Sequence, residues 1–290
     1  MTERIDLNPV PSRIVMATDL SARCDRALDR AAQLARSWDS ELLAVNVLDP
    51  TASPQQTLAW VDGQSDEGLA RLAQKQLARD MSAVDVNASI RIVRGQNVAG
   101  EILQVIEQVR AGLLIIAVAH NETLGRFLLG STVDQLAQSV SIPMLVVRQR
   151  PHGPYKKILV GTDLSEPSRN ALMTAAHMFA DQNLILYHAQ TSALSSLAGK
   201  STDEVQPASP NIVQACEAFL KLTPLPDHHK VHLVVQGASI RRSLLTQVIE
   251  QDIDLVVLGN KGAGGLKNLL LGSNSQQLLQ WLPCDVLLVP

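Results

Sequence analysis

A glycine-rich segment in the second half of the chain has residue types that suit an anion. Its glycines and cations are Gly259, Lys261, Gly262, Lys267 and Gly272, followed by Ser273. Glycine lets backbone N–H groups approach a phosphate closely, and a helix that opens at Gly272 would add the free N–H groups of its first turn. The segment therefore predicts a phosphate site or, as the alternative, a flexible loop. It is neither a Walker A loop nor a GxGxxG fingerprint after a first strand.

An aspartate follows the first aliphatic run of each half, within the sequence Thr-Asp-Leu-Ser. These residues are Asp19 and Asp163. In an open parallel sheet, ligands lie beyond the carboxyl ends of the strands, so either carboxylate could accept hydrogen bonds from a purine amino group or a ribose hydroxyl. The alternative is a helix cap, in which Asp or the following Ser satisfies free N–H groups of the next helix. The residues alone leave both readings open.

The two halves of the chain share the same sequence pattern. The segment Arg13–Ser21 (RIVMATDLS) recurs as Lys157–Ser165 (KILVGTDLS), and Leu129-Gly-Ser131 recurs as Leu271-Gly-Ser273. A repeat of this length indicates two homologous domains. Proline and glycine punctuate residues 149–154 and mark a linker. The sequence thus predicts domains at 1–150 and 151–290.

Short aliphatic runs alternate with stretches of helical period in each half. The predicted strands are 13–18, 41–48, 87–93, 112–119 and 143–148 in the first half, and 157–162, 183–189, 230–236, 253–259 and 284–289 in the second. This alternation is typical of a parallel sheet that is covered on both faces. The fold class is therefore α/β, with two tandem Rossmann-like domains, each a five-stranded parallel sheet with helices on both faces. Residues 49–64 and 190–208 are predicted loops.

Composition argues against several classes of protein. The net charge is -3 and only 3% of the residues are aromatic, so neither nucleic acid nor a membrane surface is a favoured partner. The aliphatic runs are far shorter than the roughly 18–20 residues that a membrane span needs. The three cysteines, Cys24, Cys216 and Cys284, form no CxxC pair, which argues against a disulfide framework or thiolate zinc site. We expect a cytoplasmic protein.

The residues after the fourth strand of the second half carry a resemblance to a known family. The pattern Gly259-x2-Gly262-x9-Gly272-Ser273, with Asp163 after the first strand, resembles the ATP-binding branch of the universal stress proteins, whose domains are adenine nucleotide alpha hydrolase-like. The whole chain resembles a tandem member, over residues 13–148 and 157–290. The resemblance implies that ATP or another adenine nucleotide binds the second domain, with Mg²⁺ as an accompanying ion left open. The implied nucleotide-binding residues are Asp163, Tyr187, His188, Gly259, Lys261, Gly262, Gly272, Ser273, Asn274 and Ser275.

The first half departs from that pattern, because Ala117 and His120 stand where the first two glycines are expected. The first nucleotide site is therefore predicted to be degenerate. His120 could plug that site, lie at the surface or bind a ligand or metal, and the metal is disfavoured because zinc needs three or four converging ligands. The cluster His228, His229 and His232 is predicted to be a solvated strand entrance. No metal site is predicted.

The leading functional hypothesis is a stress-response or regulatory protein that binds an adenine nucleotide through its second domain, with the first domain as scaffold. No catalytic residue is predicted, because neither an in-line base nor an arginine finger is evident; slow ATP hydrolysis or self-phosphorylation is left open. The alternative is a non-nucleotide-binding dimerisation module, since the last strand of each half is short and aliphatic. The two halves are expected to form a pseudo-dimer, and homodimerisation is left open.

Overall fold

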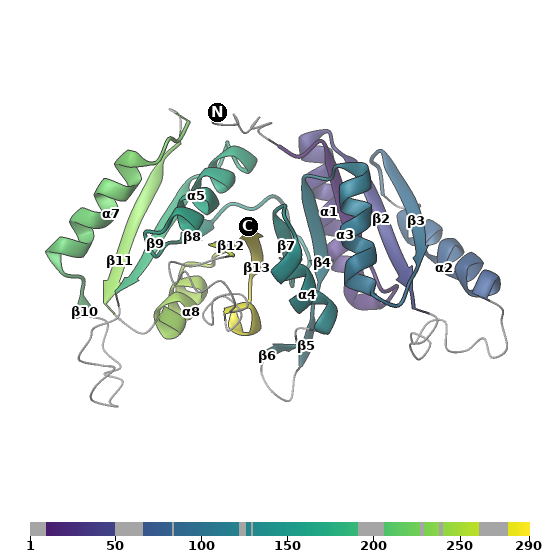
Figure 1. Ribbon diagram of the computed structural model, residues 1–290. Coiled ribbons are helices and arrows are strands. Elements are labelled where there is room, and N and C mark those ends of the chain that lie inside the picture. The colour runs from purple at the N-terminus through teal and green to yellow at the C-terminus, as the bar shows by residue number, and fades with distance from the viewer. Residues whose placement is uncertain are drawn as a thin grey trace. The chain divides into compact units, whose positions relative to one another are not determined.

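The chain divides into two compact units, Met1–Pro154 and Tyr155–Pro290, called here the first and second unit. The computed structural model describes residues 10–49, 66–82, 84–121, 126–128, 130–190, 206–226, 229–237, 240–260 and 278–290 (Figure 1). The boundary lies at Pro154 rather than at residue 150, inside the Pro- and Gly-rich segment that the sequence marks as a linker. The side chains of residues 119–129 lie outside the described part.

The first unit is built on a parallel sheet of five strands in the order β7-β4-β1-β2-β3. These strands are β1 (Arg13–Ala17), β2 (Glu41–Leu48), β3 (Ala88–Arg94), β4 (Leu113–Ala117) and β7 (Met144–Val147). The strand order reverses between β1 and β4, which is where an open parallel sheet presents its ligand-binding crevice. A separate antiparallel pair, β5 (Ala119–Asn121) and β6 (Arg126–Leu128), follows β4.

The helices of the first unit lie on both faces of this sheet. They are η1 (Ala22–Cys24), α1 (Asp25–Trp38), α2 (Asp66–Met81), α3 (Val98–Val109) and α4 (Ser131–Ser139). Right-handed crossovers place α1 and α2 on one face and α3 and α4 on the other, and α3 packs against α4. Helix α1 buries small residues, including Ala27 and Ala31, against the sheet, which allows close helix–strand packing.

The second unit repeats this architecture. Its strands are β8 (Ile158–Gly161), β9 (Leu184–Gln190), β10 (Gln206–Pro207), β11 (Val231–Gly237), β12 (Leu255–Gly259) and β13 (Asp285–Val289), in the order β10-β11-β9-β8-β12-β13. All pairs are parallel except β10–β11. The helices are α5 (Glu166–Met178), α7 (Pro210–Leu222) and α8 (Ile240–Glu250), and residues 278–281 are also helical.

The predicted fold class is confirmed. All ten predicted strands are present with bounds within two residues of those expected. Central strands such as β1 and β4 are continuous aliphatic runs that are buried on both faces of the sheet, whereas β3 is only partly buried. The short strand β10 was not predicted and lies within the expected loop 190–208. Residues 191–205 of that loop and residues 50–64 of the expected loop 49–64 lie outside the described residues. Among the described helices, none is long and apolar enough to span a bilayer.

Candidate functional site

The Thr-Asp-Leu-Ser sequence forms the same turn at the carboxyl end of the first strand of each unit. We call Thr18–Ser21 the β1 turn and Thr162–Ser165 the β8 turn. In both, the Thr hydroxyl accepts from the Leu N–H, at 3.0 Å and 2.9 Å, and the Asp Oδ1 accepts from the Ser N–H, at 3.0 Å and 3.1 Å. The Leu residues have φ of 62° and 64°, a left-handed conformation that is unfavourable for Leu and is held by these bonds.

The helix-cap reading of this sequence is therefore correct in part. In the second unit Ser165 is the N-cap of α5, and its side chain accepts from the N–H of Ser168. Asp163 stabilises the turn that precedes this cap rather than capping the helix itself. Its side chain remains exposed, so a ligand contact by the same carboxylate is compatible with the turn.

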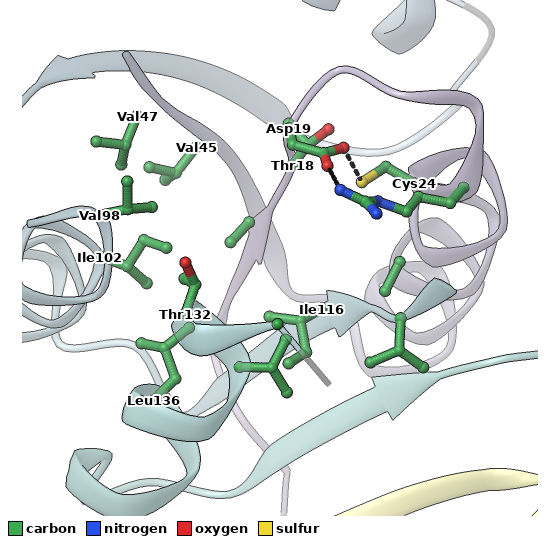
Figure 2. A pocket seen from close by; sticks show the side chains of 16 residues that line it. Thr18, Asp19, Cys24, Val45, Val47, Val98, Ile102, Ile116, Thr132 and Leu136 are labelled. Carbon is green, nitrogen blue, oxygen red and sulfur yellow. Dashed lines mark hydrogen bonds and ion pairs between the residues drawn. The ribbon is translucent and has the colours of Figure 1, made fainter. Parts of the chain in front are cut away.

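A cavity of about 270 Å³ opens at the carboxyl end of the first-unit sheet. We call it the first-unit cavity. It lies at the point where the strand order reverses, since Ala17 at the end of β1 and Ala117 at the end of β4 both line it. Most of the lining is aliphatic and comes from β2, α3, β4 and α4: Val45, Val47, Val98, Ile102, Ile116 and Leu136 (Figure 2).

One edge of the cavity is polar and is organised by Asp19. Asp19 Oδ2 accepts a charged hydrogen bond from Arg23, while Oδ1 accepts from Cys24 Sγ at 3.2 Å (Figure 2). Oδ1 also accepts from the Ser21 hydroxyl at 2.5 Å. Burial alone would raise the pKa of Asp19, but the bonds from Arg23, Ser21 and Cys24 outweigh it, so the pKa lies below its ordinary value. The carboxylate is thus ionised and paired.

Cys24 lies beside this carboxylate as a protonated thiol. Burial, and then the negative charge of Asp19, raise the pKa of Cys24 to about 11. Because the thiolate is the reactive form of cysteine, this residue is a hydrogen-bond donor and not a nucleophile at neutral pH. Together, Asp19, Arg23 and Cys24 form a polar cluster at the rim of a cavity whose other walls are mostly aliphatic.

The β8 turn lacks this polar cluster. In the repeat, Pro167 and Ser168 stand where the first unit has Arg23 and Cys24. Pro167 lies in the first turn of α5, where its missing N–H costs nothing. Asp163 is exposed, and the position that Arg23 occupies in the first unit is taken by Pro167.

Tyr187 stands at the position that Val45 occupies in the first unit. The register shows this directly, because Thr18 N–H donates to the Val45 carbonyl and Thr162 N–H to the Tyr187 carbonyl, both at 2.9 Å. The ring is 2% exposed, its hydroxyl donates to Gln236 Oε1 at 3.1 Å, and it also bonds Ser243 of α8. Burial raises the pKa of Tyr187. A tyrosine ring thus fills space at the position where the first unit has the smaller valine.

His188 supports the end of the first strand of its unit. Its Nδ1 lies 2.8 Å from the Thr162 carbonyl oxygen, so its side chain is already engaged by the backbone of the β8 turn. The family resemblance implies that Tyr187 and His188 bind the nucleotide. The structure places both residues beside the β8 turn, and nucleotide binding by them stays a prediction.

Gly259 ends β12 in close contact with the start of α5. A Cβ built on Gly259 would lie 2.7 Å from the Pro167 carbonyl oxygen and 3.1 Å from the Ser168 nitrogen. These are backbone atoms that cannot move aside easily, so the glycine is required for packing whatever it contributes to a ligand. The first unit has Ala117 at the matched position, where the helix starts later, after η1.

Part of the predicted phosphate loop lies outside the described residues. This applies to Lys261, Gly262, Gly272, Ser273, Asn274 and Ser275, and also to the side chain of His120 and to His228. Of the other two clustered histidines, His229 Nε2 donates to the Ala176 carbonyl at 2.5 Å and His232 is exposed. Within the described ranges, no three His, Cys, Asp or Glu side chains are grouped as a metal site would require.

The first-unit cavity was not predicted from the sequence. The departure from the glycine pattern indicated a degenerate site but not what would replace it. The repeat itself contained a signal, because Val45 aligns with Tyr187 and Arg23 aligns with Pro167 when the two halves are compared. These pairs show that the two units differ in bulk and charge at the same end of the sheet.

The sequence profile of the universal stress protein family matches residues 11–148 and 154–290. The chain is 26% identical to a universal stress protein of Mycolicibacterium smegmatis over 290 residues, which cover 95% of this chain and 96% of that protein. It is 30% identical to a universal stress protein of Bacillus subtilis over 152 residues, covering 47% of this chain and 99% of that protein. The fold is similar to a crystal structure of a universal stress protein from Archaeoglobus fulgidus, with a TM-score of 0.71, 16% identity, and coverage of 96% and 98%.

Proposed function

The chain belongs to the universal stress protein family as a tandem member with two family domains, and we propose that it binds ATP or a related adenine nucleotide through its second unit. Its role is that of a stress-response or regulatory protein whose state depends on the nucleotide. The proposal assigns binding and no chemical step to the described residues.

The exposed carboxylate of Asp163 is the observation that carries this proposal. It lies at the carboxyl end of β8, next to the reversal of strand order between β8 and β12, where an open parallel sheet binds ligands. A carboxylate there can accept hydrogen bonds from the adenine amino group or from ribose hydroxyls. In the first unit the matched Asp19 is half-buried and is bonded to Arg23, whereas Asp163 is exposed. This difference in exposure favours the second unit.

The phosphate part of the site rests on the sequence. After Gly259, the chain supplies Lys261, Gly262, Gly272 and Ser273 in the spacing of a glycine-rich anion loop, with Asn274 and Ser275 following. Backbone N–H groups and two lysines would neutralise phosphate charge there. Gly259 ends β12 and packs against the start of α5, so the chain leaves this strand close to the β8 turn. The adenosine and phosphate parts of the nucleotide would then bind at the same carboxyl end of the sheet.

The test compares matched variants of the full-length chain by titration calorimetry with ATP. We expect Gly272→Val with Ser273→Ala to weaken ATP binding at least tenfold. The control is the same pair in the first unit, Gly130→Val with Ser131→Ala, because a Cβ on Gly130 meets no atom within 4 Å; this variant should keep wild-type affinity. Equal loss in both variants, loss only in the control, or no ATP binding by the wild type would refute the proposal.

The same protein preparation tests the remaining parts of the reading. Nucleotide that co-purifies can be identified by mass spectrometry, and titration with and without Mg²⁺ shows whether the ion contributes. Incubation with labelled ATP tests for slow hydrolysis or self-phosphorylation. From the repeat alone we also propose that the units pair as a pseudo-dimer; native mass spectrometry of the 31.4 kDa chain distinguishes a monomer from a homodimer.

A further inference from the structure

We infer that the first-unit cavity is a second binding site, which takes a compact, uncharged and predominantly apolar small molecule without a phosphate group. This inference does not depend on nucleotide binding by the second unit. It assigns the first unit a ligand of its own, beyond the scaffold role that its altered glycine pattern predicts.

The lining of the cavity sets the chemistry of the ligand. Aliphatic side chains from four elements face the space, among them Val45 on β2, Ile102 on α3, Ile116 on β4 and Leu136 on α4 (Figure 2). Removing apolar ligand surface from water stabilises a complex by about 25 cal/mol per Å², and this lining offers that gain on several sides. Thr132 adds one hydroxyl that is directed into the cavity (Figure 2), enough to orient a single polar group.

The charges at the cavity argue against an anionic ligand. Among the lining residues that the structure describes, Arg23 carries the positive charge and is bonded to Asp19, so the two charges cancel. The first turn of α4, which also lines the cavity, carries Asp134, which opposes the attraction of the helix N-terminus for an anion. Among these described lining residues, a phosphate would meet the carboxylate of Asp19 and no cation other than the bonded Arg23. An uncharged ligand avoids that cost.

The size of the cavity limits the ligand to one or two rings. An apolar cavity of about 150 Å³ accommodates benzene, and pockets for drug-sized ligands begin near about 300 Å³. A volume of about 270 Å³ lies between these limits. A bicyclic molecule fits within this volume, whereas a nucleoside triphosphate would extend out of it.

The second unit has a larger side chain at the position of Val45. Tyr187 occupies the register position of Val45 and is held by Gln236 and Ser243. The substitution Val45→Tyr should therefore place a ring in the first-unit cavity, in a conformation that the fold already accommodates in the other unit. The second unit therefore indicates which side chain can fill the first-unit cavity.

The experiment uses the full-length protein with labelled Ile, Leu and Val methyl groups, and indole as the probe. We expect indole to shift the methyl resonances of Val45, Val47, Ile102 and Leu136 in the wild type, with a dissociation constant of roughly 1 mM or tighter, as ligand efficiency suggests for so small a molecule. Indole-3-acetate, which carries a carboxylate, should bind at least tenfold more weakly at the same methyl groups. ATP should leave them unshifted.

Two variants locate the site. Val45→Tyr should weaken indole binding at least tenfold, whereas the reciprocal change Tyr187→Val in the second unit should leave binding at the first-unit methyl groups unchanged; melting temperatures of both establish that they are folded. The inference is wrong if indole shifts none of these methyl groups, shifts only others, or binds no better than indole-3-acetate. It is equally wrong if ATP shifts them at lower concentration. Because the wild-type shifts alone decide these outcomes, an unfolded variant does not rescue the inference.

Discussion

His188 Nδ1 lies 2.8 Å from the carbonyl oxygen of Thr162. Because a carbonyl only accepts, the imidazole carries its proton on Nδ1 in this contact. Asn46 makes the matched contact in the first unit, where its Nδ2 donates to the Thr18 carbonyl at 2.8 Å. Two different side chains therefore satisfy the same backbone acceptor at the end of the first strand, directly before each Asp.

This relationship predicts that His188→Asn is tolerated and His188→Leu is not. Asn can donate to the Thr162 carbonyl as Asn46 does to Thr18, whereas Leu leaves that part-buried carbonyl unpaired. We expect the free energy of unfolding to fall by about 1–3 kcal/mol for the Leu variant, the cost of an unsatisfied buried acceptor, and to change much less for Asn. Urea denaturation measures both. Equal destabilisation by Asn and Leu would show that the ring, and not its donor, matters.

Gly259→Ala should destabilise the second unit even in the absence of ligand. The added Cβ would approach the Pro167 carbonyl oxygen to 2.7 Å, and overpacking against backbone costs about 1–3 kcal/mol. Gly161→Ala serves as the control, because its Cβ would meet the end of the flexible Leu258 side chain at 2.8 Å, which can rotate away. In thermal denaturation, the melting temperature should fall further for Gly259→Ala than for Gly161→Ala. A Gly259→Ala protein with wild-type stability would remove the packing role argued for this glycine.

The strands were predictable from the sequence because burial on both faces forces a continuous aliphatic run, as in Ile14 to Met16. The positions of Asp19 and Asp163 followed from the same logic, since each comes directly after such a run. The contacts that set the electrostatics were not predictable. Arg23 reaches Asp19 four residues earlier in the chain, and Tyr187 on β9 meets Gln236 on the neighbouring strand β11. Such contacts depend on side-chain direction and register, which no local pattern contains.

The cavity shows the same limit. Its lining comes from β1, β2, α3, β4 and α4, so it exists only once the order of the strands brings these segments together. The sequence shows that Val45 in one repeat corresponds to the larger Tyr187 in the other. Only the fold shows that both side chains lie at the ligand-binding end of the sheet.

Cys24 should resist alkylation at neutral pH. With a pKa of about 11, its thiolate fraction at pH 8 is roughly two-hundredfold below that of an ordinary cysteine with a pKa of about 8.5. We expect iodoacetamide to label it correspondingly slowly, with the rate rising up to about pH 11. Asp19→Asn should lower the pKa, because it removes the negative charge beside the sulfur, and so speed labelling at pH 8. Peptide mapping by mass spectrometry follows Cys24 separately from the buried Cys284. Rapid labelling of the wild type at pH 7 would contradict the assigned thiol.

The pairing of Asp19 with Arg23 should make part of the stability depend on pH. The folded-state pKa of Asp19 lies below its unfolded value, so its contribution is complete above the unfolded pKa of about 3.9 and is lost as pH falls through the folded pKa. Asp19→Asn should therefore lower the free energy of unfolding by about 1–2 kcal/mol at pH 7, as for a partly exposed charged hydrogen bond. The gap to the wild type should narrow as pH falls below about 4. Urea denaturation at pH 7, 5, 4 and 3 measures this gap. The matched comparison is Asp163→Asn, which makes the same change in the turn where Pro167 stands in the place of Arg23; in both variants the amide oxygen of Asn can still accept from the Ser N–H. A gap for Asp19→Asn that is constant with pH would mean that the charge of Asp19 does not account for the loss.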